Sequence, residues 1–161
     1  MSQVLQLVAV TRERVGLIAP LFDAYRQFYG QTSDLDGAHQ FLLERLGRGE
    51  SVIFAVIEGE IALGFTQLYP SFSSVSMGPM WILNDLFVVE KARRRGIGAR
   101  LLRAARDHAL RTGAVRLVLA TGVENFTAQA LYEQQGWQKD TAFLQYVFQL
   151  PKETDNSSRS D

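Results

Sequence analysis

The stretch LFVVEKARRRGIGARLL, residues 86–102, decides the fold of this chain. It begins with a β-branched run typical of a strand, passes through a charged turn to Gly96-Ile97-Gly98, and ends in an amphipathic helical pattern. Glycines at a strand-to-helix turn let the backbone approach a ligand and point free N–H groups at it. The first turn of the helix adds N–H donors and the positive end of the helix dipole. The stretch therefore predicts a phosphate cradle, with a tight turn before a basic helix as the simpler alternative.

Basic residues crowd around this turn, although the whole chain has 17 basic and 17 acidic residues and no formal net charge. Nine of the basic residues lie within positions 91–116, where Asp107 is the only acidic residue, and the rest of the chain holds the other 8 basic and 16 acidic residues. Overall neutrality argues against a protein that coats nucleic acid, and no aromatic residues are interleaved for base stacking. The local field favours an anionic ligand, and a solvated arginine-rich helix face is the alternative.

Composition excludes several other classes of protein. The 161 residues are 47% hydrophobic and 21% charged, as expected for one soluble globular domain, here residues 1–150. With no cysteine and two histidines, the chain has no disulfide framework, no cysteine nucleophile and no expected metal site. No leader or long apolar run is found, so we expect a cytoplasmic protein without a membrane partner. The polar tail at 151–161 is expected to be disordered.

The remaining sequence alternates strand and helix patterns. Strands are expected at 5–10, 51–57, 61–69, 81–89, 115–120 (buried), 137–140 and 143–150, and helices at 15–29, 35–46, 98–111 and 127–135. This order mixes an antiparallel meander with helical crossovers. It predicts an α+β domain with three layers (α/β/α), a mixed and mostly antiparallel sheet of about seven strands, and four helices.

Two motifs in the expected order resemble the GNAT superfamily of acetyl-CoA-dependent N-acetyltransferases. RRRGIG, residues 93–98, resembles the Arg/Gln-x-x-Gly-x-Gly/Ala loop that holds the acetyl-CoA pyrophosphate in that family, whereas a Walker A loop or a Rossmann fingerprint fits poorly. NFTAQALYEQQGW, residues 125–137, has Asn, Ala, Leu-Tyr and Gly-aromatic at the family's spacing. The resemblance covers roughly residues 5–150. YRQFY, residues 25–29, also resembles the first helix of the yeast histone and polyamine N-acetyltransferases.

The resemblance implies a set of cofactor-binding residues. Backbone groups of Leu86, Phe87 and Val88 would pair with the thioester carbonyl and the pantetheine arm, at the splayed edge of the sheet. Backbone N–H groups from Arg94 to Ala99 would hold the pyrophosphate, within the cofactor-binding loop formed by Arg93, Arg94, Arg95, Gly96, Ile97, Gly98 and Ala99. Asn125 would position the pantetheine arm, cap the helix that follows it, or do both.

The catalytic residues implied are Tyr132 and Asp85. Without a cysteine no acetyl-thioester can form on the enzyme, so direct attack by a primary amine in a ternary complex is favoured. Tyr132 would face the sulfur and donate a proton to the leaving thiolate; a packed aromatic is the alternative. Asp85 would contact the amine or relay its proton, or else only form structural hydrogen bonds. Successive strand residues face opposite sides, so Asn84 and Asp85 cannot both point into the cleft without a bulge.

The sequence thus predicts an N-acetyltransferase that uses acetyl-CoA. The acidic remainder of the chain favours a small cationic acceptor such as a polyamine, or a lysine-like amine. Acceptor choice is expected to depend on the first two helices, the loop at 70–79 and the last strands. A catalytically silent acyl-CoA-binding or regulatory domain is the rival function, and a nucleic-acid-binding module is a weaker one. The expected partners are acetyl-CoA and the amine, with a homodimer left open.

Overall fold

The strand patterns of the first half of the chain form an antiparallel meander. In the computed structural model, which describes residues 3–152, β1 (Leu5–Ala9), β2 (Val52–Glu58), β3 (Ile61–Ser73) and β4 (Gly78–Val88) lie side by side in chain order. Each pairs antiparallel with the next, and β5 (Leu117–Val118) joins the outer edge of β4 in parallel. The sheet is therefore mixed and mostly antiparallel, as predicted.

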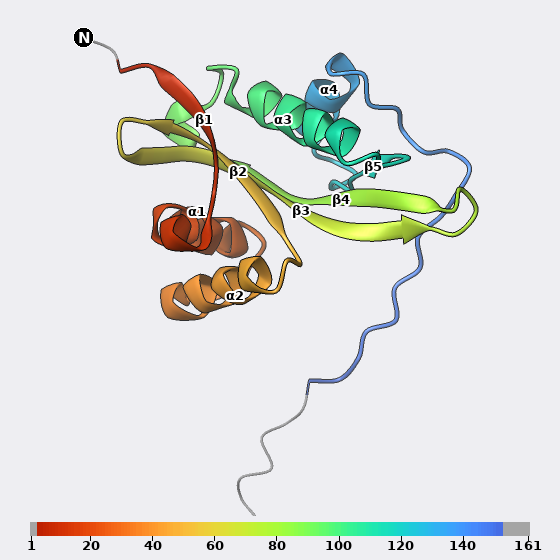
Figure 1. Cartoon of the computed structure of the whole chain (residues 1–161), viewed down its shortest axis with the longest axis horizontal. Coiled ribbons are helices and arrows are strands. Elements are labelled where there is room, and N and C mark those ends of the chain that lie inside the picture. Colours follow the sequence, from red (N-terminus) through yellow and green to blue (C-terminus); the bar gives the residue numbers. More distant parts are fainter. Residues whose placement is uncertain (1–2, 153–161) are drawn as a thin grey trace, which may run out of the picture.

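Helices cover both faces of this sheet (Figure 1). α1 (Val15–Phe28) and α2 (Leu35–Gly47) lie on one face, and α3 (Ile97–Arg111) and α4 (Phe126–Gln134) lie on the other. Short 3-10 turns at Arg12–Arg14 and Glu90–Ala92 precede α1 and α3. The expected α+β class, three layers and four helices are confirmed within the described part of the chain.

Two apolar cores lie between the three layers. On one face, Ile18, Phe22 and Leu42 from the helices pack against strand residues such as Phe65. On the other, Ile97, Leu101 and Leu102 of α3 pack against the opposite side of β2, β3 and β4. Burial of apolar residues on both sides explains why the strands of the meander are near-continuous apolar runs.

The last part of the predicted sheet is wrong. The structure has five strands rather than about seven, because 137–140 and 143–150 form no strand and 115–120 is paired only at Leu117–Val118. No residue of 115–120 is buried, although that strand was expected to be. A strand needs a hydrogen-bonded neighbour, and in the described residues nothing pairs with the outer edge of β5.

The predicted loop at 70–79 is also wrong, since most of it extends the β3–β4 hairpin. β3 continues to Ser73 and β4 starts at Gly78, with Pro70 paired opposite Trp81. Pro70 lies beyond the last β2 partner of β3, at Leu68, so it interrupts no ladder on that side.

The predicted domain boundaries are not tested by the described residues. The expected tail at 151–161 lies mostly outside them, and the domain at 1–150 stays a prediction. None of the helices in residues 3–152 has the length and apolar character needed to cross a membrane.

Candidate active site

The sheet opens where β4 and β5 part. The two strands pair only at Trp81 with Leu117 and at Ile82 with Val118, so the edge of β4 from Leu83 to Val88 faces no β5 neighbour. Open backbone groups at such an edge can pair with an extended ligand as if it were an added strand. This is the splayed edge that the resemblance led us to expect.

A pocket with a volume of about 750 Å³ occupies this opening. Its walls come from the end of β4, the turn and first residues of α3, α4, and the C-terminal end of α1. Most residues singled out from the sequence meet here: Leu86, Phe87, Val88, Arg93, Arg94, Gly96, Ile97, Gly98, Ala99, Asn125 and Tyr132. Asp85 and Arg95 are the two that do not line it.

The glycine turn has the geometry of an anion cradle. Gly96 has φ of 75° and Arg94 has φ of 63°, so two residues in this short turn are left-handed. Left-handed residues alternating with right-handed ones turn successive N–H groups to the same side, and a non-glycine residue there is uncommon. α3 starts immediately after, at Ile97, and its first N–H groups have no acceptor within the helix. The turn and the helix start together can bind a phosphate through backbone donors.

The three arginines of the turn differ in their surroundings. Arg93 and Arg94 line the pocket, and the Arg93 Nε donates to the carbonyl of Val88 at 3.3 Å. Arg95 instead pairs with Glu58 at the end of β2, with Nη1 2.9 Å from Oε2. Hydrogen bonds from Arg95 lower the pKa of Glu58. The Arg95 side chain therefore ties the turn to the sheet, while the expected role of its backbone N–H in holding pyrophosphate stays a prediction.

Asn125 and Tyr132 lie on the α4 side of the pocket. The Asn125 Oδ1 accepts from the backbone N–H of Ala128 at 3.2 Å, so Asn125 caps α4 and also lines the pocket. Tyr132 packs beside Trp137, with ring centroids 6.3 Å apart. Burial is the main cause that raises the pKa of the Tyr132 phenol. Tyr132 therefore keeps its proton near neutral pH and can donate it within the pocket.

A bulge in β4 decides which way Asn84 and Asp85 face. Gln67 pairs with Asp85 and Leu68 pairs with Leu83, so Asn84 is the extra residue on β4. Asn84 lines the pocket, whereas Asp85 is only 3% exposed and does not.

Asp85 is held in a chain of buried hydrogen bonds. Its Oδ2 accepts from Gln67 Nε2 at 2.6 Å, its Oδ1 accepts from Asn84 Nδ2 at 3.0 Å, and the Oε1 of Gln67 accepts from Ser51 Oγ at 2.7 Å. Burial is the largest cause acting on Asp85 and raises the pKa of its carboxyl, while hydrogen bonds from Gln67, Asn84 and Tyr25 act in the opposite direction. Asp85 is thus a buried acid that reaches the pocket only through its neighbours.

Tyr25 is the neighbour that connects Asp85 to the pocket, and sequence reasoning did not give it a role. Its hydroxyl donates to the carbonyl of Asn84 at 3.3 Å, and burial followed by the nearby Asp85 raises the pKa of the phenol strongly. Phe28 and Tyr29 line the same wall. The signal was present, because YRQFY at the end of α1 holds three aromatic residues of which two carry hydroxyls, but this segment was used only as a family resemblance.

His108 of α3 is half-buried and lies against two aromatic rings. Its ring centroid lies 4.8 Å from that of Trp81 and 5.7 Å from that of Phe54, and burial lowers the pKa of the imidazole. Residues 3–152 contain no group of three or more side chains suited to hold a metal ion.

Comparison with known proteins agrees with this geometry. The profile of the acetyltransferase (GNAT) family matches residues 18–137. The Bacillus subtilis (strain 168) protein named uncharacterized N-acetyltransferase YhfO is 54% identical over 134 residues, which cover 83% of this chain and 90% of that protein. A crystal structure of a probable acetyltransferase is 43% identical with a TM-score of 0.86, covering 92% of this chain and 99% of that one.

A more distant structure shares the fold alone. An aminoglycoside N-acetyltransferase solved in complex with CoA is 16% identical with a TM-score of 0.77, covering 93% of this chain and 98% of that one. The family profile spans most of the chain. The Bacillus subtilis protein and the probable acetyltransferase match this chain over nearly their whole length. The chain therefore belongs to the GNAT family of acetyltransferases.

Proposed function

We propose that the protein transfers the acetyl group of acetyl-CoA to a primary amine, by direct attack of the amine within a ternary complex. One observation carries the proposal: a single pocket joins the left-handed glycine turn at the start of α3 to the protonated Tyr132 of α4. The turn suits the pyrophosphate end of the cofactor, and Tyr132 suits its sulfur end. The open edge of β4 lies along the same pocket.

The residues present fit CoA. The backbone N–H groups of the turn and of the first residues of α3 suit a pyrophosphate, and Arg93 and Arg94 add positive charge beside them. The backbone of β4 from Leu86 to Val88 suits the amide groups of the pantetheine arm, and Asn125 lines the same pocket. Gly98 has no side chain here, and a Cβ built on it would come within 3.0 Å of Leu131 Cδ2.

Bound acetyl-CoA supplies an activated acetyl group as a thioester, and the protein's residues manage the protons. The amine nitrogen forms a bond to the carbonyl carbon as the carbon–sulfur bond breaks, and the Tyr132 hydroxyl donates a proton to the departing thiolate. The amine must first lose a proton, which for an alkyl amine with a pKa near 10.4 costs about 4.6 kcal/mol at pH 7. A base or a local field has to offset that cost.

We assign the base function to Asp85 acting through Tyr25. Asp85 is buried with a raised pKa, which makes its carboxylate a stronger base than an exposed one. Because Asp85 does not line the pocket, the Tyr25 hydroxyl, which donates to the Asn84 carbonyl in this structure, would turn to the Asp85 carboxylate and give it a proton as it takes one from the amine. Asp85 is on this view a positioning and proton-accepting residue, and Tyr25 is the group that touches the amine.

The acceptor wall favours a cationic amine. Phe28 and Tyr29, which are 65% and 58% exposed, line the pocket beside Tyr25, and aromatic faces attract ammonium groups. The excess of acidic residues outside positions 91–116 also attracts cationic molecules, at longer range. A polyamine-like small molecule and a lysine-like amine both carry this chemistry.

An acceptor screen that follows release of free CoA tests the proposal, preceded by a thermal-shift assay. CoA and acetyl-CoA should raise the melting temperature by binding the folded state, and adenosine should raise it much less. No shift at millimolar CoA would overturn the cofactor assignment. A clear CoA shift with no turnover on any amine in the screen would favour the rival, a catalytically silent acyl-CoA-binding domain.

A further inference from the structure

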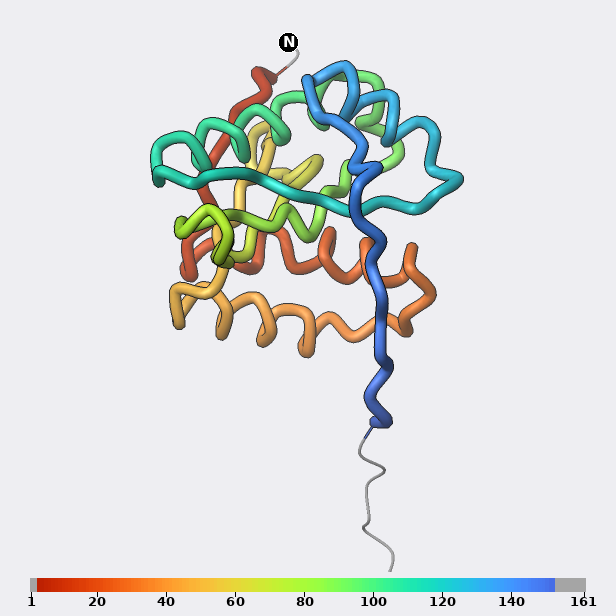
Figure 2. Tube along the Cα trace, turned by 90° about the vertical axis from the view of Figure 1, so that its right-hand side faces the viewer, coloured from red at the N-terminus to blue at the C-terminus, as the bar shows by residue number. Residues whose placement is uncertain are grey.

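Three polar side chains form a row inside the sheet core that faces α1 and α2. Ser51, Gln67 and Asp85 are 6%, 0% and 3% exposed. Gln67 pairs with Asp85 across β3 and β4, and it shares a strand face with Phe65, which packs in that core. Figure 2 shows these strands between α1 and α2 on one side and α3 on the other. Burying polar groups costs free energy that apolar residues would not, so packing alone does not explain the row.

The hydrogen bonds of the row have a direction. The Ser51 hydroxyl donates to Gln67 Oε1 at 2.7 Å, which leaves the other end of the amide, Nε2, to donate to Asp85 Oδ2 at 2.6 Å. With its oxygen bound in this way, the amide presents only N–H groups to the carboxyl. An N–H donor favours the charged form of a carboxyl and so opposes the effect of burial. Gln67 therefore favours Asp85 as a carboxylate, which can accept a proton.

The backbone and the second oxygen of Asp85 are also fixed. The Thr66 hydroxyl donates to the backbone carbonyl of Asp85 at 2.9 Å, and Asn84 Nδ2 donates to Asp85 Oδ1 at 3.0 Å. Asp85 is thus bound to β3 and to the bulge of β4. Each carboxylate oxygen can accept more than one hydrogen bond, so a proton can still reach Asp85 without breaking these contacts.

The pocket side is the route by which a proton can reach Asp85. Tyr25 of α1 and Tyr69 of β3 are the titratable side chains that lie near it in the described chain; after burial, Asp85 is the next cause that raises the pKa of Tyr69, and Arg45 of α2 acts in the opposite direction. Tyr25 lines the pocket and Tyr69 does not. The amide of Gln67 does not titrate near neutral pH, so the row does not carry a proton further into the core.

We infer that Gln67 and Ser51 are positioning residues for the reaction: Ser51 fixes the amide of Gln67, and Gln67 holds the Asp85 carboxylate ready to accept the amine proton through Tyr25. The inference rests on the base function proposed above for Asp85. Neither Gln67 nor Ser51 lines the pocket, so both act through Asp85. Without the N–H donor of Gln67, burial would keep Asp85 protonated to a higher pH, where it cannot take another proton.

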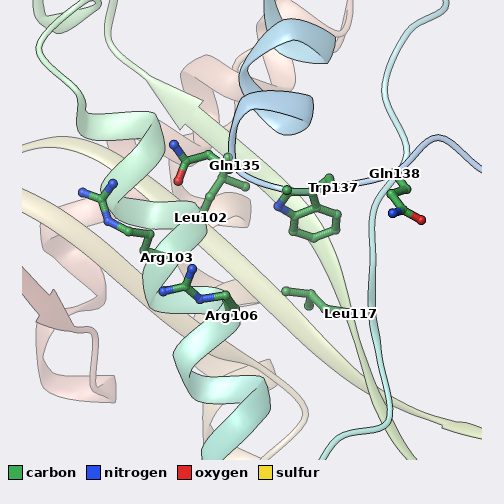
Figure 3. Close-up of a pocket in the computed structure, with 8 residues that line it drawn as sticks. Leu102, Arg103, Arg106, Leu117, Gln135, Trp137 and Gln138 are labelled. Carbon is green, nitrogen blue, oxygen red and sulfur yellow. The ribbon is translucent and has the colours of Figure 1, made fainter.

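An NMR titration of Asp85 tests the inference without needing turnover. Gln67→Met keeps the length of the side chain and removes the donor. With ¹³C-labelled aspartate carboxyls, and the Asp85 signal identified by its absence in Asp85→Asn, the titration midpoint should rise by about one to two pH units. Gln135→Met makes the same change in a separate groove of about 340 Å³ (Figure 3) and should leave the midpoint unchanged. A wild-type midpoint in folded Gln67→Met overturns the inference.

Ser51 gives a second and milder test, which decides the matter if Gln67→Met does not fold. Ser51→Ala frees the Gln67 amide to turn, so the Asp85 midpoint should rise by up to about one pH unit. Ser51→Thr keeps the hydroxyl and should restore the wild-type midpoint. Ser73→Ala is the matched control, because Ser73 is also buried and its Oγ accepts from the backbone N–H of Ser76 rather than contacting Gln67. A wild-type midpoint in Ser51→Ala overturns the role of Ser51.

The pH profile of kcat/KM then connects the row to the reaction. On the acid side, kcat/KM of Gln67→Met should be about tenfold lower for each pH unit by which the midpoint rises, and it should approach the wild-type value at higher pH. A loss that is equal at every pH, or an acid limb that stays in place while the NMR midpoint moves, overturns the positioning role. A wild-type protein that acetylates no amine contradicts the proposed function instead, and the NMR titration still decides whether Gln67 and Ser51 hold Asp85 as a carboxylate.

Discussion

The middle of the sheet and the last third of the chain have similar apolar sequences but very different burial. In β2 every residue from Ile53 to Ile57 is buried, between β1 and β3 and between the two helical layers. From residue 110 to residue 152 none is buried, although this region includes VRLVLA and FLQYVFQL. The difference lies in the neighbours, because apolar strand residues are buried only when a sheet partner and a covering layer are both present.

This contrast separates stability from chemistry. The buried meander should carry most of the folding free energy, because buried apolar area is the main favourable contribution. The half-exposed side, with α4 and the start of α3, forms much of the open pocket and carries Tyr132, the proposed proton donor. Substitutions in the two regions should therefore change different measured quantities.

Truncation of a central core residue should have the largest effect. Phe65 of β3 is fully buried and contacts the rings of Phe22 and Tyr25 edge-on. Phe65→Ala should lower the free energy of unfolding by about 3–5 kcal/mol in urea unfolding. Phe126→Ala on α4, where the ring is 70% exposed, should change it by less than about 0.5 kcal/mol. Equal losses for both variants would remove the contrast between the regions.

Removing the Tyr132 hydroxyl should affect turnover while leaving stability nearly unchanged. Tyr132→Phe keeps the ring beside Trp137, so the fold and CoA affinity should survive. If the hydroxyl meets the sulfur as charge develops there, kcat should fall by about 10²–10⁴-fold, the usual contribution of a general acid. Turnover within about threefold of wild type, with chemistry shown to be rate-limiting, would return Tyr132 to a packing role.

A charge placed in the glycine turn should weaken CoA binding by a smaller factor. Gly98→Glu puts a carboxylate beside the proposed pyrophosphate site, and its Cβ meets only the flexible end of Leu131, so the fold should tolerate it. The dissociation constant for CoA should rise at least about tenfold, or 1.4 kcal/mol, by calorimetry. Gly16→Glu on α1, where a Cβ meets nothing within 4 Å, is the control and should bind CoA normally. Unchanged affinity in folded Gly98→Glu would make the loop only a turn.

The sequence predicted those elements whose partners are near in the chain. The meander and its hairpins pair consecutive strands, and the glycine turn and the Asn125 cap depend on local geometry, so pattern and motif sufficed. The absence of a strand at 143–150 could not be predicted, because a strand pattern does not show whether a hydrogen-bonding partner lies beside it. The bulge at Asn84 and the pairing of Arg95 with Glu58 also escaped prediction, since both depend on register between strands.

The smallest expected effect is a pH dependence of the free energy of unfolding that comes from Asp85. This residue lies on β4, the strand between the buried meander and the open pocket. Burial raises the pKa of Asp85 above its ordinary value of 3.8, so the folded state holds this proton more tightly than the unfolded state. The free energy of unfolding should therefore fall as pH rises from about 3.8 through the raised pKa, by at most about 1.4 kcal/mol per pH unit. Asp85→Asn should remove that fall in urea unfolding across a pH series at fixed protein concentration.

Glu58 provides a control of opposite sign for this last prediction. Its hydrogen bonds to Arg95 lower its pKa below 4.5, so it stabilises the fold above that pH and loses this contribution as pH falls. Glu58→Gln should thus remove a rise of stability with pH, where Asp85→Asn removes a fall. If Asp85 also accepts the amine proton through Tyr25, Asp85→Asn should in addition change the pH dependence of kcat/KM, which a purely structural role would leave unmoved. Identical pH slopes in wild type and Asp85→Asn would mean that burial does not hold the proton on Asp85, and the base would have to be sought elsewhere in the pocket.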